Sequence, residues 1–289
     1  MIPAGFDYHA PRSVADAVKL LGSLGPDAKL LAGGHSLLPM MKLRFAEPGH
    51  LIDLGKIATL RGISQVGNEI HIGAMTTEHD LLNSALLADT LPLLVEGASW
   101  IADPQVRYKG TIGGDISHAD PANDQPALML ALDASFVLTG PRGDRVVPAD
   151  GFFIGVYATQ LQADEILSQI RIPMPPAGSV GAYAKLKRKT GDFATAATAV
   201  MLQMDGTRVA QARIALTNAG PTALRARAAE ASLVGKPLNK AAAHEAARLA
   251  MAICKPAPDQ RGDVEYKTAM CGEMTLRALR TAHGRMAQP

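Results

Sequence analysis

The stretch LLAGGHSLLPMMK, residues 30–42, places two adjacent glycines directly after a short apolar run. Gly33 and Gly34 are followed by a polar pair, His35 and Ser36. Adjacent glycines let a chain adopt positive φ and let another group come close to the backbone. Successive N–H groups at such a turn form a concave site for anions, commonly phosphate. The stretch therefore predicts a short strand (AKLLA) that ends in an anion-binding turn, with a tight structural turn as the plainer alternative.

A second stretch of the same kind, KGTIGGDISHADPAND, occupies residues 109–124. Two such turns, each after an apolar segment and each followed by small polar positions, favour a shared ligand over two unrelated structural turns. Neither stretch contains the GxGxxG fingerprint, and no GxxxxGK[ST] motif occurs in the chain, so the Rossmann and P-loop interpretations fail. Two separate glycine turns indicate a long ligand with a central pyrophosphate, and FAD meets that description.

Composition sets the class of protein. A chain of 289 residues is long for one core, so two domains are expected. It is 47% hydrophobic and 19% charged, which excludes a disordered chain. A net charge of +2 and 4% aromatic residues give no support for a nucleic-acid surface.

Cysteine use and apolar runs indicate the compartment. Cys254 and Cys271 are the two cysteines, with no CxxC pair, so this chain alone is not expected to build a zinc site or an iron–sulfur cluster. Two unpaired thiols suit a reducing compartment. We find no signal-peptide pattern and no apolar run of about 18 residues. We therefore expect a cytoplasmic protein with no membrane span.

Local patterns predict alternating strands and short helices in the first part of the chain. Ser13, with Asp16 three residues on, is typical of a helix N-cap, and LIDL at 51–54 is typical of a strand. Gly67-Asn68 predicts a hairpin in ISQVGNEIHIGAM, and a second hairpin is expected in SFVLTGPRGDRVVPA. We expect helices in TEHDLLNSALL, TLPLLVEGASWIA and DQPALMLALDA, then a strand, EILSQIRIP, before a proline-rich linker at 173–178.

The pattern changes beyond this linker. VGAYAKLKRKTGDFATAATAVMLQM and TRVAQARIALTNAG are each typical of a long strand, and Asp205-Gly206 predicts the hairpin that joins them. Three alanine-rich helical segments follow, at about 222–234, 239–253 and 263–285. Strands followed by helices indicate an α+β second domain.

The two glycine motifs also carry a family resemblance. AGGHS at 32–36 and TIGGD at 111–115 resemble the paired FAD motifs of the flavoprotein subunit in the molybdenum hydroxylase family. That family includes xanthine dehydrogenase and aerobic carbon monoxide dehydrogenase, and the likeness is strongest to the medium subunit of the latter. The similarity covers nearly the whole chain, through FDYHAPRS, IGAMTTEHDL and IADPQVRYKGTIGG to KLKRKTGDFATAA.

The resemblance implies the fold. It implies an α+β protein with a two-subdomain FAD-binding domain of the PCMH (vanillyl-alcohol-oxidase-like) type at 1–175, divided at about 1–55 and 56–175. A C-terminal α+β domain with a small antiparallel sheet and helices is expected at 176–289.

The resemblance also implies cofactor-binding residues in the glycine motifs, which wrap the pyrophosphate through backbone N–H groups and the Ser36 hydroxyl. They are Ala32, Gly33, Gly34, His35, Ser36, Thr111, Ile112, Gly113, Gly114 and Asp115. Asp115 stands where the family commonly has asparagine. A carboxylate there repels a pyrophosphate unless it points elsewhere or a neighbour supplies a proton or a cation.

Five further residues are expected at the ends of the flavin. Asp124 matches a position that contacts the adenosine end, where a carboxylate accepts from ribose hydroxyls, and a helix N-cap is an equally sensible role. Lys185 and Asp192 border the isoalloxazine ring by the resemblance, although the run KLKRKTGD otherwise suits a solvated face. A cation there stabilises reduced flavin. Phe193 is expected to shield or gate the ring, and Leu167 to pack on it.

The implied function is electron transfer. FAD is the only cofactor expected on this chain, with the molybdopterin cofactor on a large partner subunit and two [2Fe–2S] clusters on a small one. Electrons then pass through FAD to an external acceptor such as a quinone. We expect a dimer of heterotrimers, with carbon monoxide as the favoured substrate and no catalytic or metal-binding residue here. Membrane association through a quinone or a partner stays open.

Three alternatives stay open beside this function. The first is the FAD subunit of another xanthine- or aldehyde-type dehydrogenase. The second is a stand-alone flavin oxidase, although no base or covalent flavin attachment residue stands out. The third is a nucleotide-binding assembly protein that delivers cofactor to a partner.

Overall fold

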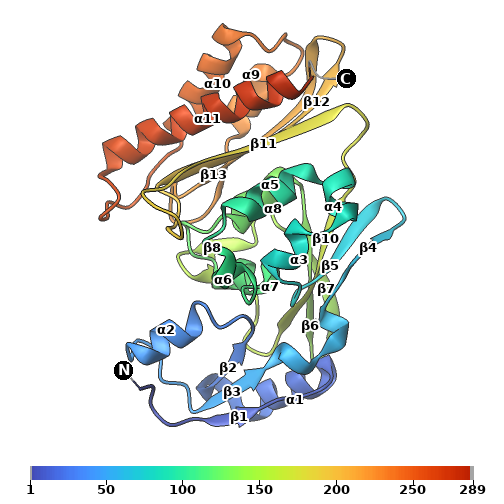
Figure 1. Cartoon of the computed structure of the whole chain (residues 1–289), viewed down its shortest axis with the longest axis vertical. Coiled ribbons are helices and arrows are strands. Elements are labelled where there is room, and N and C mark those ends of the chain that lie inside the picture. The colour runs from blue at the N-terminus through green and yellow to red at the C-terminus, as the bar shows by residue number, and fades with distance from the viewer. Residues whose placement is uncertain (1, 287–289) are drawn as a thin grey trace.

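The three larger β-sheets follow one another along the long axis of the molecule (Figure 1). The computed structural model of the chain describes residues 2–286. The N-terminal sheet lies at one end, the C-terminal sheet with its helices at the other, and a larger antiparallel sheet lies between them. Strands and helices are mixed in each part, which confirms the predicted α+β class.

The N-terminal unit is a parallel sheet in the order β1-β3-β2 with one helix that packs on it. Its elements are β1 (Asp7–His9), α1 (Val14–Leu24), β2 (Ala28–Leu31), α2 (Leu37–Lys42) and β3 (His50–Asp53). The predicted cap is confirmed, because the Ser13 hydroxyl accepts from the Asp16 N–H at 3.0 Å. Helix α1 buries Ala17 and Leu21 against the sheet, so the end of β2 and the first glycine pair are held in place.

The middle unit is a five-stranded antiparallel sheet in the order β4-β5-β10-β6-β7, with short helices around it. Its strands are β4 (Ile63–Val66), β5 (Glu69–Gly73), β6 (Ser135–Gly140), β7 (Gly143–Pro148) and β10 (Ile166–Pro173), with a small hairpin of β8 (Phe153–Gly155) and β9 (Ala158–Thr159). Both predicted hairpins are confirmed, since β4 pairs with β5 around Gly67 and β6 pairs with β7.

The helices of the middle unit are short. They are α3 (Glu78–Leu82), α4 (Ala85–Thr90), α5 (Pro92–Trp100), α6 (Pro104–Arg107), α7 (Ile112–His118) and α8 (Gln125–Ala131). Of these, α3, α4, α6 and α7 each begin at a side-chain cap. The single helix predicted over TEHDLLNSALL was wrong. It is two helices, because α3 ends at Asn83 and the Ser84 hydroxyl accepts from the Leu87 N–H to start α4.

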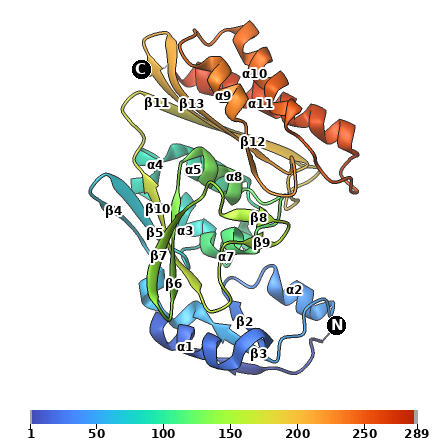
Figure 2. The same cartoon turned by 180° about the vertical axis from the view of Figure 1, so that it is seen from behind.

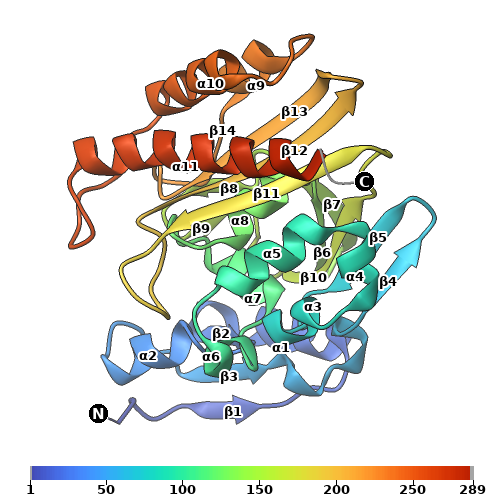
Figure 3. The ribbon, with the colours of Figure 1, turned by 45° about the horizontal axis from the view of Figure 1, so that its top comes forward.

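The C-terminal unit is a four-stranded antiparallel sheet, β11-β12-β13-β14, with three helices on its outer face (Figure 3). Its elements are β11 (Ser179–Leu186), β12 (Ala196–Asp205), β13 (Arg208–Thr217), β14 (Leu224–Arg225), α9 (Arg227–Leu233), α10 (Lys240–Ala252) and α11 (Val264–Met286). Helices α5 and α8 of the middle unit pack against the sheet from the other side. Within residues 2–286, no helix has the length and apolarity that a bilayer crossing needs.

Two predicted C-terminal elements differ from the structure. The long strand predicted over 180–204 is two strands, β11 and β12, because the charged run 187–195 leaves the sheet as a loop. The helix predicted from residue 222 begins only at Arg227, since Leu224 and Arg225 pair with β13. The predicted hairpin at Asp205 is confirmed.

One apolar core joins the middle and C-terminal units. Buried side chains of the C-terminal sheet, including Tyr183 and Met201, pack in the same cluster as Leu93 and Leu128 of the middle unit. The connections between the three sheets run over 54–62 and 174–178. The fold thus fixes the loop after β11 relative to the glycine motifs of the other two units.

Candidate functional site

The main cavity is a cleft of about 830 Å³ that residues of all three units line. This volume lies within the range of about 300–1,000 Å³ that is usual for small-molecule sites. Ile112 is the one predicted residue that does not line it. The fourteen that do are Ala32, Gly33, Gly34, His35, Ser36, Thr111, Gly113, Gly114, Asp115, Asp124, Leu167, Lys185, Asp192 and Phe193.

The two glycine motifs pack against each other, backbone to backbone. A Cβ atom added to Gly33 would overlap the Lys109 carbonyl oxygen and lie 2.8 Å from Gly110 Cα. One added to Gly114 would lie 3.5 Å from Ala32 Cβ. The two turns therefore face the same cleft, and the absence of a side chain at Gly33 is what lets them approach.

The first motif leaves backbone donors unused. Gly34 has φ +76°, a conformation that favours glycine, and it turns the chain out of β2 toward α2. The amide N–H groups of residues 33–36 have no acceptor among residues 2–286. Four consecutive donors on residues that line the cleft are the chemistry that an oxyanion such as a diphosphate needs.

The second motif, by contrast, uses the amides of residues 112–115 within the protein. The Ile112 N–H donates to Thr76 O at 3.1 Å, and the Gly113 N–H donates to Ala74 O at 2.9 Å. The next two amides, of residues 114 and 115, donate to the hydroxyl and the carbonyl of Thr111 at 3.1 and 3.0 Å. The amides of residues 112–115, which were predicted to wrap the pyrophosphate, are therefore already paired within the protein. Ile112 has a fully buried side chain and a paired amide, so the structure brings it to the core and not to the cleft.

A buried carboxyl group missed by the sequence lies beside the second motif. Glu78 is 2% exposed, lines the cleft and accepts from Gln125 Nε2 at 2.9 Å. Burial raises the pKa of Glu78 to about 8. Burial also raises the pKa of Asp115 well above its ordinary value, with further contributions from Glu78 and Asp124. Both shifts favour the protonated, neutral form of the carboxyl group, which reduces the repulsion that an Asp115 carboxylate would exert on a pyrophosphate.

Asp124 and Lys185 form a buried ion pair across two units. Asp124 Oδ2 lies 2.6 Å from Lys185 Nζ, and Asp124 Oδ1 accepts from the Tyr183 hydroxyl at 2.5 Å. Asp124 precedes α8, yet its side chain makes no capping hydrogen bond, so the capping interpretation was wrong. Burial first, then Asp124, raises the pKa of Tyr183, so the phenol stays protonated. Lys185 thus reaches the cleft with its charge largely balanced.

The loop 187–195 is held by ion pairs. Asp192 accepts from Arg188 at 2.9 Å and from Arg261 at 2.7 Å. Burial would raise the pKa of Asp192, but hydrogen bonds from the two guanidinium groups outweigh burial and lower it to about 2. Phe193 is 43% exposed, and the Arg261 guanidinium lies 5.6 Å from its ring centroid. Leu167, from β10, is buried and also lines the cleft.

Two further cleft residues come from the end of α7 and the β8–β9 hairpin, which lie side by side (Figure 2). The rings of His118 and Tyr157 are 4.9 Å apart, and the Tyr157 hydroxyl donates to Asp120 at 3.1 Å. Burial lowers the pKa of His118, so the imidazole is neutral at pH 7. No local pattern pointed to these residues, because their contacts form only in the fold.

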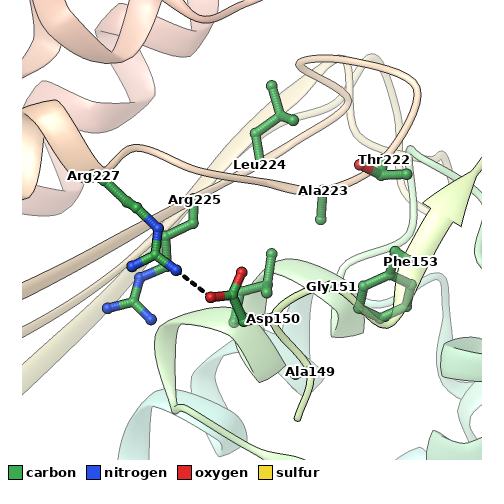
Figure 4. Close-up of a pocket in the computed structure, with 10 residues that line it drawn as sticks. Ala149, Asp150, Gly151, Phe153, Thr222, Ala223, Leu224, Arg225 and Arg227 are labelled. Atoms are coloured by element: carbon green, nitrogen blue, oxygen red, sulfur yellow. Dashed lines mark hydrogen bonds and ion pairs between the residues drawn. The ribbon is translucent and has the colours of Figure 1, made fainter. Parts of the chain in front are cut away.

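A second cavity of about 230 Å³ lies between the middle and C-terminal units (Figure 4). Its walls include Asp150, Phe153 and Thr222, and its Arg227 pairs with Asp150. No predicted residue lines it. It is too small for a dinucleotide, so the large cleft is the candidate site.

A cleft lined by all three sheet units, with unused amide donors at a glycine turn, fits a flavoprotein of the dinucleotide-binding kind. The chain belongs to the molybdenum hydroxylase flavoprotein family: residues 4–175 match the FAD binding domain in molybdopterin dehydrogenase. Residues 181–282 match the C-terminal domain of the carbon monoxide dehydrogenase flavoprotein. The predicted resemblance and its cofactor, FAD, are confirmed.

Individual relatives are similar over their full length. The carbon monoxide dehydrogenase medium chain of Hydrogenophaga pseudoflava is 58% identical over 287 residues, which cover 99% of this chain and 100% of the relative. That of Afipia carboxidovorans is 53% identical, with 99% of each covered. A chain of the solved Hydrogenophaga pseudoflava carbon monoxide dehydrogenase superposes with a TM-score of 0.97 at 61% identity, covering 99% of both. A chain of quinoline 2-oxidoreductase from Pseudomonas putida 86 superposes with a TM-score of 0.94 at 34% sequence identity. The match covers 99% of this chain and 100% of that one.

The residues present fit FAD. The close approach at Gly33 leaves no room for a side chain, and the four unpaired amides lie beside it. The cleft then extends past the neutral wall of Glu78 and Asp115 to Lys185, Asp192 and Phe193. An elongated nucleotide is the ligand that uses all of these features.

Proposed function

We propose that this chain is the FAD-carrying electron-transfer subunit of an aerobic carbon monoxide dehydrogenase. The identity of 58% over the whole length of a carbon monoxide dehydrogenase medium chain supports the choice of complex. The single structural observation that carries the role is the row of unpaired amides at 33–36 in a cleft of about 830 Å³. Domain limits of 1–175 and 176–289 are part of this proposal.

Different residues of the cleft hold different parts of FAD. The amides of residues 33–36 and the Ser36 hydroxyl donate to the diphosphate, and Gly33 sets the distance between the two motifs. Asp124 accepts from the ribose while Lys185 and Tyr183 hold it in place. Leu167 and Phe193 enclose the ring system. FAD, when bound, receives electrons singly and releases them in pairs.

The partners we propose are a large subunit with the molybdopterin cofactor and a small subunit with two [2Fe–2S] clusters, arranged as a dimer of heterotrimers. Electrons pass from the molybdenum site through the clusters to FAD and then to an acceptor such as a quinone. A cytoplasmic location is supported by the two free thiols, Cys254 and Cys271.

The test is purification of the native complex through this chain. We expect one FAD per chain, molybdenum and iron in the complex, a native mass that fits two heterotrimers, and reduction of a quinone analogue that depends on carbon monoxide. Reduction by xanthine or an aldehyde, but not by carbon monoxide, would assign the chain to another dehydrogenase of the family. Oxygen consumption by the chain alone would instead indicate a stand-alone oxidase, and absence of flavin would overturn the proposal.

A further inference from the structure

Three buried side-chain oxygens at the second motif have no hydrogen-bond partner among the described residues. They are Glu78 Oε1, Asp115 Oδ1 and Gln125 Oε1. Glu78 is 2% exposed and Gln125 is fully buried. Glu78 and Asp115 both line the flavin cleft. Buried acceptors without a donor are costly, so native structures normally supply them with one.

The charges around these groups do not supply the missing partner. Lys185, a buried cation whose charge acts on Asp115, is paired with Asp124 at 2.6 Å and also donates to Trp100 O. The Arg107 guanidinium of α6 acts on Glu78 only at a distance and donates to Ile101 O. Asp120 adds another negative charge near Asp115, and the neutral Tyr183 donates to Asp124. No cation is paired with either carboxyl group in the part of the chain described.

A proton on each carboxyl group turns two of these three acceptor groups into donors. A protonated carboxyl group has one O–H donor and one acceptor, so it offers a neighbouring oxygen the hydrogen bond that a carboxylate cannot. Burial raises the pKa of Glu78 to about 8 and that of Asp115 well above its ordinary value, in agreement with this assignment. Ionisation of either group would place an unbalanced negative charge in the wall of a cleft that takes a dianionic diphosphate.

We propose that Glu78 and Asp115 form a protonated carboxyl pair in the wall of the cleft, and that retention of FAD requires both protons. This inference rests on the proposed FAD-binding function. It makes Glu78, which the glycine motifs do not include, a determinant of cofactor affinity. It also makes that affinity depend on pH above neutrality.

The first experiment uses the wild-type full chain after removal of flavin. FAD affinity is measured by quenching of flavin fluorescence between about pH 6.5 and pH 9. We expect the dissociation constant to rise about tenfold from pH 7 to pH 9, because the raised pKa places loss of a proton in this range. Calorimetry at pH 8 in two buffers of different ionisation enthalpy should show uptake of about half a proton per FAD bound.

The second experiment uses the isosteric variant Glu78→Gln/Asp115→Asn, which keeps a donor and an acceptor at each position. We expect its dissociation constant to change less than about twofold over the same pH range. Asp205→Asn, at the exposed turn between β12 and β13, is the matched control and should follow the wild type.

The outcomes separate the two proposals. FAD binding without pH dependence or proton uptake in the wild type overturns the carboxyl-pair inference and leaves the proposed function standing. So does a pH dependence that persists in the double variant. Failure of the wild type to bind FAD at any pH overturns the proposed function as well. Calorimetry on the wild type decides the question even where the double variant does not fold.

Discussion

At the scale of single residues, the two glycines of the first pair are each required for a different physical reason. Gly34 adopts φ +76°, which few residues other than glycine tolerate. Gly33 does not have positive φ and is needed for space instead, because the backbone of 109–110 occupies the place of a side chain. A substitution at Gly33 therefore changes the separation of the two motifs and not only the shape of one turn.

We expect Gly33→Ala to lose FAD affinity by at least about tenfold. The added methyl group meets backbone atoms that cannot rotate away, and overpacking of this kind costs about 1–3 kcal/mol. Equilibrium dialysis against FAD measures the effect. Gly22→Ala, in α1 with no heavy atom within 4 Å of the new Cβ, is the control and should bind FAD normally. Equal affinity of both variants would show that the contact at Gly33 does not shape the site.

Glu78 yields a prediction about stability. Its folded pKa of about 8 lies above its ordinary value of 4.5, so the folded state binds the extra proton between these two values. The contribution of Glu78 to the stability of the protein without FAD therefore falls as pH rises from about 4.5 to 8 and is flat above. Glu78→Gln removes that loss, so its Tm should exceed the wild-type value by about 5 °C at pH 8 and match it near pH 5. Thermal unfolding followed by circular dichroism checks this, and a Tm difference that does not vary with pH would contradict it.

Sequence patterns found the residues whose role is local and missed those whose role depends on distant partners. The Ser13 cap and the positive-φ turn at Gly34 depend on neighbours within a few positions. Glu78 contacts Gln125 across 47 positions of sequence, and Asp192 contacts Arg261 across 69. No rule based on periodicity or spacing predicts such pairs, because the two residues come together only in the folded protein.

At the scale of elements, the loop 187–195 shows how a charged run acquires a function. Its sequence suits a solvated surface, yet Asp192 is pinned by Arg188 of the same loop and by Arg261 from the connection between α10 and α11. Because the pKa of Asp192 is about 2, below its ordinary value of 3.8, this stabilisation is in place above about pH 4 and is lost as pH falls toward 2. The loop is therefore ordered throughout the neutral range.

Arg261→Gln should loosen this loop. The variant loses the charged hydrogen bonds to Asp192 and the contact with Phe193, so amide hydrogen exchange over 187–195 should rise severalfold. Mass spectrometry of exchange at neutral pH measures this. Arg277→Gln, whose side chain pairs with Glu273 on α11 itself, is the control and should leave the loop unchanged. Unaltered exchange in Arg261→Gln would show that other contacts order the loop.

Helices and strands were predicted correctly where the sequence contains residues that are typical of a turn. The hairpins at Gly67 and Asp205 were found because short polar turns separate alternating strands. The break between β11 and β12 was missed, because apolar residues on both sides resemble one continuous strand. The short strand β14 was also missed, since Leu224 and Arg225 are strand only by pairing with β13.

At the scale of the whole molecule, the cleft belongs to no single domain. The two motifs come from the first two sheets, and Lys185, Asp192 and Phe193 come from the third unit. The resemblance implied this arrangement, but spacing alone could not, because it depends on how the C-terminal sheet docks on α5 and α8. The buried pair of Asp124 and Lys185 lies at that docking surface.

Lys185→Met should destabilise the protein by about 3–5 kcal/mol, because it leaves the Asp124 carboxylate buried without its cation. The double variant Lys185→Met/Asp124→Asn should recover part of that loss, since neither charge remains. Urea unfolding measures both, and Lys189→Met, an exposed residue of the same charged run, should stay within about 0.5 kcal/mol of the wild type. Additive losses in the double variant would show that the two side chains are not coupled.

The contact of Gly33 with the peptide of Lys109 and Gly110 has a consequence for how the site receives a ligand. Main chain rests directly on main chain there, with no rotatable side chain between, so the separation of the two motifs is set by the backbone and not by side-chain rotamers. The unpaired amides of residues 33–36 are thus held in position relative to the second motif before a ligand arrives, which is the property of a preorganised site.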